Sequence, residues 1–253
     1  MSASKPEPFF LGWSKKLPKG LRRFVPALCA VLMVLFGGAG FLIGATQNDP
    51  GDGGSPRYGR QSLTAVLMAE PYPTLFVVES ARYPAGTPLL LSGLGKRGVQ
   101  DRANPLNGSL VAASGVPLKR GSLDMLQLAG GTNGLQAAGG TGVALPPAVP
   151  LGRWRLTGEI CDGKCYAGAM RPGQGLAHKA CANLCLIGGV PPVFASTGPV
   201  EGESFFLMAG PDGGPLPAEI LNDTAVLVSL EGEIERRGAL LIFKIAPDSL
   251  EVL

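Results

Sequence analysis

The sequence contains few charges, and this shortage excludes one class of function. Charged residues make up 16% of the 253 residues, and the formal net charge is only +3. Much of that excess lies in one short N-terminal segment. The rest of the chain therefore lacks the basic surface that nucleic-acid binding requires, and we expect no nucleic-acid partner.

The familiar catalytic and cofactor motifs are also absent. A Ser-His-Asp triad is unsupported, because no G-x-S-x-G element occurs and the single histidine, His178, belongs to another pattern. The glycine clusters do not open a helix after a strand, which argues against a phosphate loop or a dinucleotide fingerprint. The cysteines form no C-x-x-C pair, no C-x-x-C-H haem site and no ferredoxin spacing. We therefore favour a protein that is not an enzyme, and we name no catalytic residue.

One long run, residues 24–46, carries no charged residue. As a helix it would reach about 34 Å, enough to span a hydrocarbon core of about 30 Å. The alternative is a cleaved signal peptide, whose apolar region would normally cover only about 7–15 residues. We expect a transmembrane helix over 24–46, preceded by a cytoplasmic segment over 1–23.

The charges that flank this run predict its orientation. Acidic residues follow the run, and five basic residues precede it: Lys15, Lys16, Lys19, Arg22 and Arg23. Positive charge is retained on the cytoplasmic side of a membrane. We therefore expect the N-terminus in the cytoplasm and residues 47–253 on the opposite side, which in a bacterial inner membrane is the periplasm.

The exported region is predicted to be mainly β. After a flexible linker over 47–56 the chain consists of short apolar runs separated by glycine and proline, without a long helical period. Five of these runs read as strands: 63–68, 74–78, 88–91, 109–113 and 125–128. Short strands that close on themselves avoid exposed edges, which favours small OB-like β-barrels.

The second half of the exported region repeats the first in part. Residues 111–129 align with residues 228–246 without gaps, at an offset of 117, whereas 60–65 align with 153–158 at an offset of 93. The second copy is therefore about 24 residues longer, and a cysteine-bearing insertion accounts for the excess. Chance similarity between glycine-punctuated hairpins is the alternative.

We expect a first barrel over 57–130, a Gly/Pro linker over 131–150, and a second OB-like domain over 151–253 that carries a helical insertion with cysteine and histidine.

Four of the five cysteines and the only histidine lie between residues 161 and 185. A helix over 177–186 would place His178, Cys181 and Cys185 on one face, at i, i+3 and i+7. Cys165 arrives from the preceding turn and completes a set of one histidine and three cysteines. Such a set suits a tetrahedral ion, zinc or copper.

Disulfides are the alternative for the same residues. The predicted compartment is oxidising and the local cysteine count is even, so Cys161–Cys185 and Cys165–Cys181 bridges would each contribute about 3 kcal/mol. In the metal reading Cys161 is an additional thiol. The spacing leaves both readings open.

The segment also resembles a known pattern, G-E-x-x-D-x-x-C-Y…H-x-x-C-A-x-x-C-x-x-G-x-P, of a largely uncharacterised family of bacterial exported or membrane-anchored proteins. Cys161 lies outside that pattern. The resemblance implies an OB-like second barrel and a core set of Cys165, His178, Cys181 and Cys185. It also implies six supporting residues: Glu159, Asp162, Tyr166, Gly188, Gly189 and Pro191.

Three functions remain in consideration. We favour a non-catalytic accessory or structural subunit of a membrane redox or metalloenzyme system, whose partners would be other membrane or periplasmic subunits. The second is a metal-binding or electron-carrying protein with a Cys3His site. The third is a thiol–disulfide protein.

Overall fold

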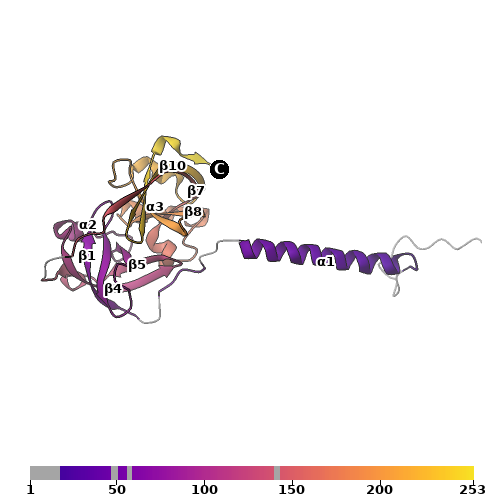
Figure 1. The fold of residues 1–253 in the computed structure, drawn as a ribbon, viewed down its shortest axis with the longest axis horizontal. Helices are drawn as coiled ribbons and strands as arrows, with labels where there is room; N and C mark the ends of the chain where they lie inside the picture. Colours follow the sequence, from indigo (N-terminus) through magenta and orange to yellow (C-terminus); the bar gives the residue numbers. More distant parts are fainter. Residues whose placement is uncertain (1–17, 47–50, 56–58, 140–142) are drawn as a thin grey trace, which may run out of the picture. The chain divides into compact units, whose positions relative to one another are not determined.

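The computed structural model describes residues 18–46, 51–55, 59–139 and 143–253. The chain divides into two compact units, before and after residue 50. The first contains helix α1 (Leu21–Thr46) and the second contains every described strand (Figure 1). Most of the predicted cytoplasmic segment, and part of the predicted linker over 47–56, lie outside the described residues.

Helix α1 confirms the predicted apolar helix. An 18-residue window within Leu21–Ala45 has a mean hydropathy of 2.3. Pro26 lies near its start, in the second turn. The helix is long and apolar enough to cross a membrane.

The first barrel contains the five predicted strands. They are β1 (Gln61–Met68), β2 (Thr74–Ser80), β3 (Pro88–Ser92), β4 (Leu110–Arg120) and β5 (Leu123–Leu128). Their order is β1-β2-β3-β5-β4, and pairing of β1 with β4 closes the sheet into a barrel. Only β3 and β5 run parallel. A short helix, α2 (Gln100–Ala103), and the turn η1 (Asn104–Leu106) connect β3 to β4.

The second barrel has the same topology. Its strands are β7 (Ala148–Asp162), β8 (Pro192–Val200), β9 (Glu203–Ala209), β10 (Leu227–Arg237) and β11 (Leu240–Ile245). They follow the order β7-β8-β9-β11-β10, closed by β7 and β10, and β9 and β11 are again the parallel pair. Turns η5 (Ala218–Asp223) and η6 (Pro247–Ser249) and the short strand β12 (Glu251–Val252) complete it.

The strand register supports the internal repeat in detail. In the first barrel Gly115 pairs with Leu128, and in the second Gly232 pairs with Ile245, so both partners are displaced by 117 residues. The β1–β2 connection covers residues 69–73, whereas the β7–β8 connection covers residues 163–191. The β7–β8 connection is therefore 24 residues longer than the β1–β2 connection, which is the excess predicted from the two offsets.

The predicted linker over 131–150 is partly built into the barrels. It contains the turn η2 (Thr132–Gly134), the strand β6 (Leu135–Ala137) and the first residues of β7. Strand β6 pairs with β4 and buries Leu135. The high glycine content pointed to a linker, but one apolar residue and free backbone groups on β4 suffice to add a strand.

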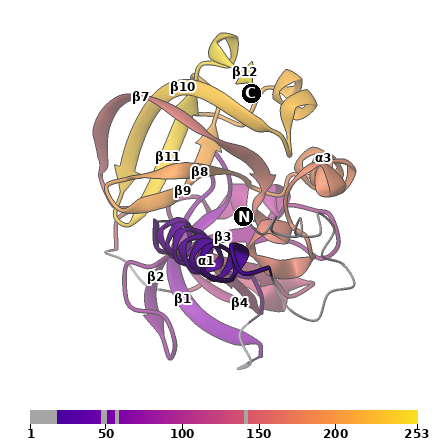
Figure 2. The same ribbon diagram turned by 90° about the vertical axis from the view of Figure 1, so that its right-hand side faces the viewer.

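The two barrels lie side by side (Figure 2), and an apolar core of their own packs between them. Separate cores fill the first and second barrels. The core between them joins Phe76, Leu123 and Met125 of the first barrel to Val193 and Leu207 of the second. Burial of this apolar surface holds the barrels as one unit.

We predict that Gly232→Ala destabilises the protein by about 1–3 kcal/mol, the usual cost of forcing extra volume into a packed site. A Cβ at this position would overlap the backbone carbonyl of Lys244 and the ring of Phe243. Thermal unfolding of the full chain in detergent, followed by circular dichroism, measures the change. Gly198→Ala, in the exposed part of β8, is the control, because no atom outside the neighbouring residues lies within 4 Å of that Cβ. Equal stability of the two variants would contradict the prediction.

Candidate metal centre

A buried carboxylate, Asp162, begins the insertion at the end of β7. Its Oδ1 accepts a hydrogen bond from the Cys165 backbone N–H at 2.8 Å, which fixes the start of the turn η3 (Cys165–Ala169). Its Oδ2 lies 3.0 Å from Nε2 of His178, and both side chains are almost fully buried. One carboxylate therefore positions two of the predicted ligands.

The loop that follows is held close to the same turn. The side chain of Glu159 accepts a hydrogen bond from the Gly175 N–H at 2.7 Å. Gly173 packs so closely on Cys165 that a Cβ would overlap the cysteine carbonyl. The chain then enters the turn η4 (Leu176–His178) and helix α3 (Lys179–Ile187). Helix α3 confirms most of the helix predicted over 177–186, but it begins two residues later, so that His178 lies in η4 and not on α3.

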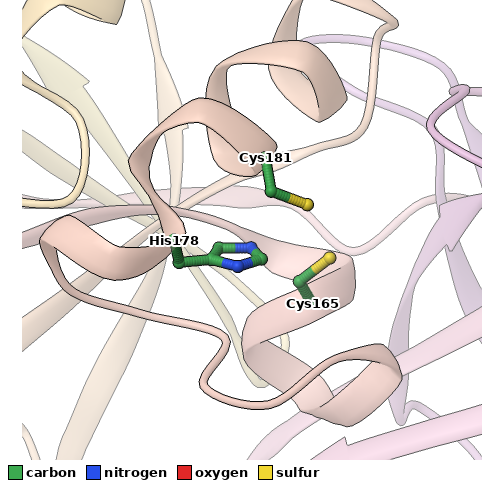
Figure 3. A group of neighbouring side chains, drawn as sticks. All are labelled: Cys165, His178 and Cys181. Atoms are coloured by element: carbon green, nitrogen blue, oxygen red, sulfur yellow. The ribbon is translucent and has the colours of Figure 1, made fainter.

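Three of the four predicted ligands converge, and the fourth, Cys185, groups with Cys165 and Asp162 instead. One donor atom each from Cys165, His178 and Cys181 lie within 4.8 Å of one another, and Figure 3 shows these side chains pointing toward a common space. Donor atoms of Asp162, Cys165 and Cys185 form a second group within the same limit. Because Nε2 of His178 faces Asp162, its Nδ1 is the nitrogen left to bind an ion.

The cluster reaches the surface at one point. Cys165, Cys185 and His178 are buried, whereas Cys181 is half-buried. The sulfur of Cys181 lies 3.7 Å from Sδ of Met170, whose side chain is 47% exposed. An ion could therefore enter past Met170 and Cys181.

The loop over 93–98 of the first barrel contributes a lysine side chain and two backbone carbonyls to this site. Nζ of Lys96 contacts Sγ of Cys181 and lies 4.0 Å from Sγ of Cys185. In the opposite direction, the buried Lys164 donates hydrogen bonds to the carbonyls of Gly93 and Gly95, each at 2.7 Å. The insertion and the loop are thus joined by reciprocal lysine contacts.

The pattern glycines Gly188 and Gly189 lie at this same junction. The carbonyl of Gly188 accepts the Gly98 N–H at 2.7 Å, and that of Gly189 accepts the side-chain amide of Gln100 at 2.7 Å. A Cβ on Gly188 would overlap the carbonyl of Lys96. Glycine is required here because two backbones approach each other directly.

The two buried thiols, Cys165 and Cys185, differ in the direction in which their pKa is shifted. A hydrogen bond with Cys185 and burial raise the pKa of Cys165 well above its usual value. The same hydrogen bond lowers the pKa of Cys185, with a further contribution from the Lys96 ammonium. Burial lowers the pKa of Lys164. Of this pair, Cys185 therefore loses its proton more readily, and Cys165 is the hydrogen-bond donor.

The remaining pattern residues form the scaffold of the centre. The ring of Tyr166 lies beneath the Arg120 guanidinium, 4.2 Å from its carbon, and packs edge-on against Phe205. The carbonyl of Pro191 accepts the Gly163 N–H at 2.9 Å and closes the base of the insertion. These contacts fix the turn that carries Cys165.

Cys161 lies apart from the thiol cluster, in the core between the barrels. Its thiol hydrogen-bonds the Glu159 carboxylate at 3.4 Å, and burial raises its pKa well above the usual value. The predicted Cys161–Cys185 and Cys165–Cys181 disulfides are not formed, and all five cysteines are free thiols. The first pairing fails because successive residues of β7 point to opposite faces, which turns Cys161 away from the side that Asp162 occupies.

Sequence reasoning missed Lys96, Lys164 and Met170. Lys96 is 85 residues away from Cys181 in the chain, so no local pattern links the two. Met170 stands in the glycine-rich loop, where nothing in the spacing of the cysteines marks it.

Comparisons with protein-family models, with curated proteins and with solved structures find no significant match. The family resemblance of the cysteine segment therefore stays a prediction.

We predict that Lys96→Gln raises the pH at which the first thiolate of the protein forms. The Lys96 ammonium favours the thiolate of Cys185, so its removal raises the pKa of that thiol. Absorbance near 240 nm, recorded against pH on the reduced full chain in detergent, measures the midpoint. Arg97→Gln, on the same loop and equally charged, should leave the midpoint unchanged. An unaltered midpoint in Lys96→Gln would refute the assignment.

Proposed function

We propose that this protein is a membrane-anchored metal-binding protein that holds one ion through Cys165, His178, Cys181 and Cys185. The observation that carries the proposal is the convergence of thiols on an imidazole whose other nitrogen faces a buried carboxylate. Metal-binding histidines usually have such a carboxylate or carbonyl partner, which fixes the tautomer and the ring.

The centre is preorganised before any ion binds. Asp162 holds both the turn of Cys165 and the ring of His178, while Cys181 and Cys185 are one helical turn apart on α3. An ion would replace thiol protons, which would pass to solvent, so affinity should rise with pH. Three sulfurs and one nitrogen suit zinc or copper.

We further propose the location predicted from the flanking charges. Helix α1 would anchor the chain in a bacterial inner membrane, and residues 47–253 would lie in the periplasm. The length and hydropathy of α1 support the anchor. The metal centre would then handle an ion, or carry an electron, at the outer side of that membrane.

The accessory-subunit role, which the sequence favoured, ranks second. No surface of the described residues points to a particular partner subunit, whereas a specific cluster supports the metal centre. A metal-handling protein can still act within a larger membrane system, so the two roles are compatible.

We predict that the purified, reduced full chain binds one equivalent of zinc, and that His178→Ala lowers the affinity at least tenfold. Asp162→Asn should lower it about 10–100-fold, because the second partner of a ligand histidine contributes that much. Zinc content by elemental analysis, a free-thiol count and competition with a chromogenic chelator measure these effects.

Cys161→Ala is the matched control, since this cysteine lies outside the cluster. It should keep both the stoichiometry and the affinity of the parent chain. Absence of stoichiometric metal together with loss of free thiols would refute the proposed function in favour of disulfides. Circular dichroism of each variant verifies that the fold is retained.

A further inference from the structure

We propose that the centre is built for a soft monovalent ion, copper(I), and that Met170 supplies a thioether ligand at its mouth. This inference rests on the proposed metal site and specifies which ion the site selects. The inference is based on the sulfur atom of Met170, which does not belong to the predicted Cys3His set.

The position of Met170 fits a shared ion. Its Sδ lies 3.7 Å from Sγ of Cys181. Two sulfurs that bind one tetrahedral ion at about 2.3 Å each lie about 3.8 Å apart. The two sulfur atoms therefore already have the separation of a pair of ligands, without a change of backbone.

The loop that carries Met170 is held in place. The Ala167 carbonyl accepts a hydrogen bond from the Gly54 N–H at 3.0 Å, and Nη2 of Arg171 donates to the Gly53 carbonyl at 3.1 Å. Arg171 directly follows Met170 in the chain, and Ala167 precedes it by three residues. Met170 is thus an exposed apolar side chain on an anchored loop, directed at a thiol.

The donor set discriminates between ions. Zinc sites in proteins use thiolate, imidazole and carboxylate ligands. A thioether is a soft, neutral donor that favours copper(I) together with thiolates. Adding Met170 to Cys165, Cys181 and Cys185 makes the mouth of the centre rich in sulfur, which selects the softer ion.

The charge of the site agrees with a monovalent ion. Thiolates that share one copper(I) leave an excess of negative charge, which is costly to bury without compensation. The Lys96 ammonium contacts Cys181 and lies 4.0 Å from Cys185. The first barrel thereby supplies a positive charge that offsets the excess negative charge of the thiolates. A divalent ion would need less of this compensation, because it neutralises more of that charge itself.

The test compares copper(I) and zinc on the same variants of the full chain in detergent. Copper(I) affinity is measured anaerobically against bicinchoninate, and zinc affinity against a chromogenic chelator. Met170→Leu should weaken copper(I) binding about tenfold or more and leave zinc affinity unchanged. X-ray absorption of the copper(I) protein should show one sulfur neighbour fewer in the variant.

Met208→Leu is the control, because it removes a buried methionine of the second barrel, remote from the thiols. It should alter neither affinity. Unchanged copper(I) affinity in Met170→Leu, or an equal loss for both ions, would overturn the role of Met170 while the zinc site stands. Failure of the parent chain to bind either ion would overturn both this inference and the proposed function.

Discussion

The centre depends on one buried carboxylate. Asp162 is the last residue of β7 and is fully buried, a position that is costly for a charge unless hydrogen bonds compensate it. The Cys165 N–H and the His178 ring provide that compensation. Because Asp162 belongs to a barrel strand, its two contacts hold the turn of Cys165 and the start of the helical segment in fixed positions relative to the sheet. The insertion is therefore ordered although it is long and rich in glycine.

The first barrel is more than a second copy of the same fold. Its loop over 93–98 meets the insertion backbone to backbone at Gly98 and Gly188, a contact that side chains of any size would prevent. Through this contact Lys96 reaches the thiols of the other barrel, and Lys164 reaches back. Both barrels are thus needed to complete one centre. The two barrels share one topology, and the insertion in the second places the thiol cluster at their junction.

The thiols at the junction are polarised by their neighbours. A hydrogen bond from Cys165 lowers the pKa of the Cys185 thiol, and the Lys96 ammonium lowers it further. Such polarised sulfurs are good ligands. Cys161, the fourth cysteine of the segment, is separated from them by its burial between the barrels, so the cluster has three thiols and a histidine. That composition matches the ligand set implied by the family resemblance. The pattern of that family does not include Cys161.

The sequence alone determined the strands of the first barrel, the length of the insertion and the helix that carries Cys181 and Cys185, because each depends on a short sequence period or on a comparison of two offsets. It also singled out Cys165, His178, Cys181 and Cys185 by their density in the chain. Only the tertiary structure decided that Cys161 turns away, that the thiols stay unpaired, and that Lys96 and Met170 join them. The physical reason is that these contacts join residues whose positions follow from barrel closure and from the packing of one barrel on the other. No local pattern encodes a lysine that meets a cysteine 85 residues later.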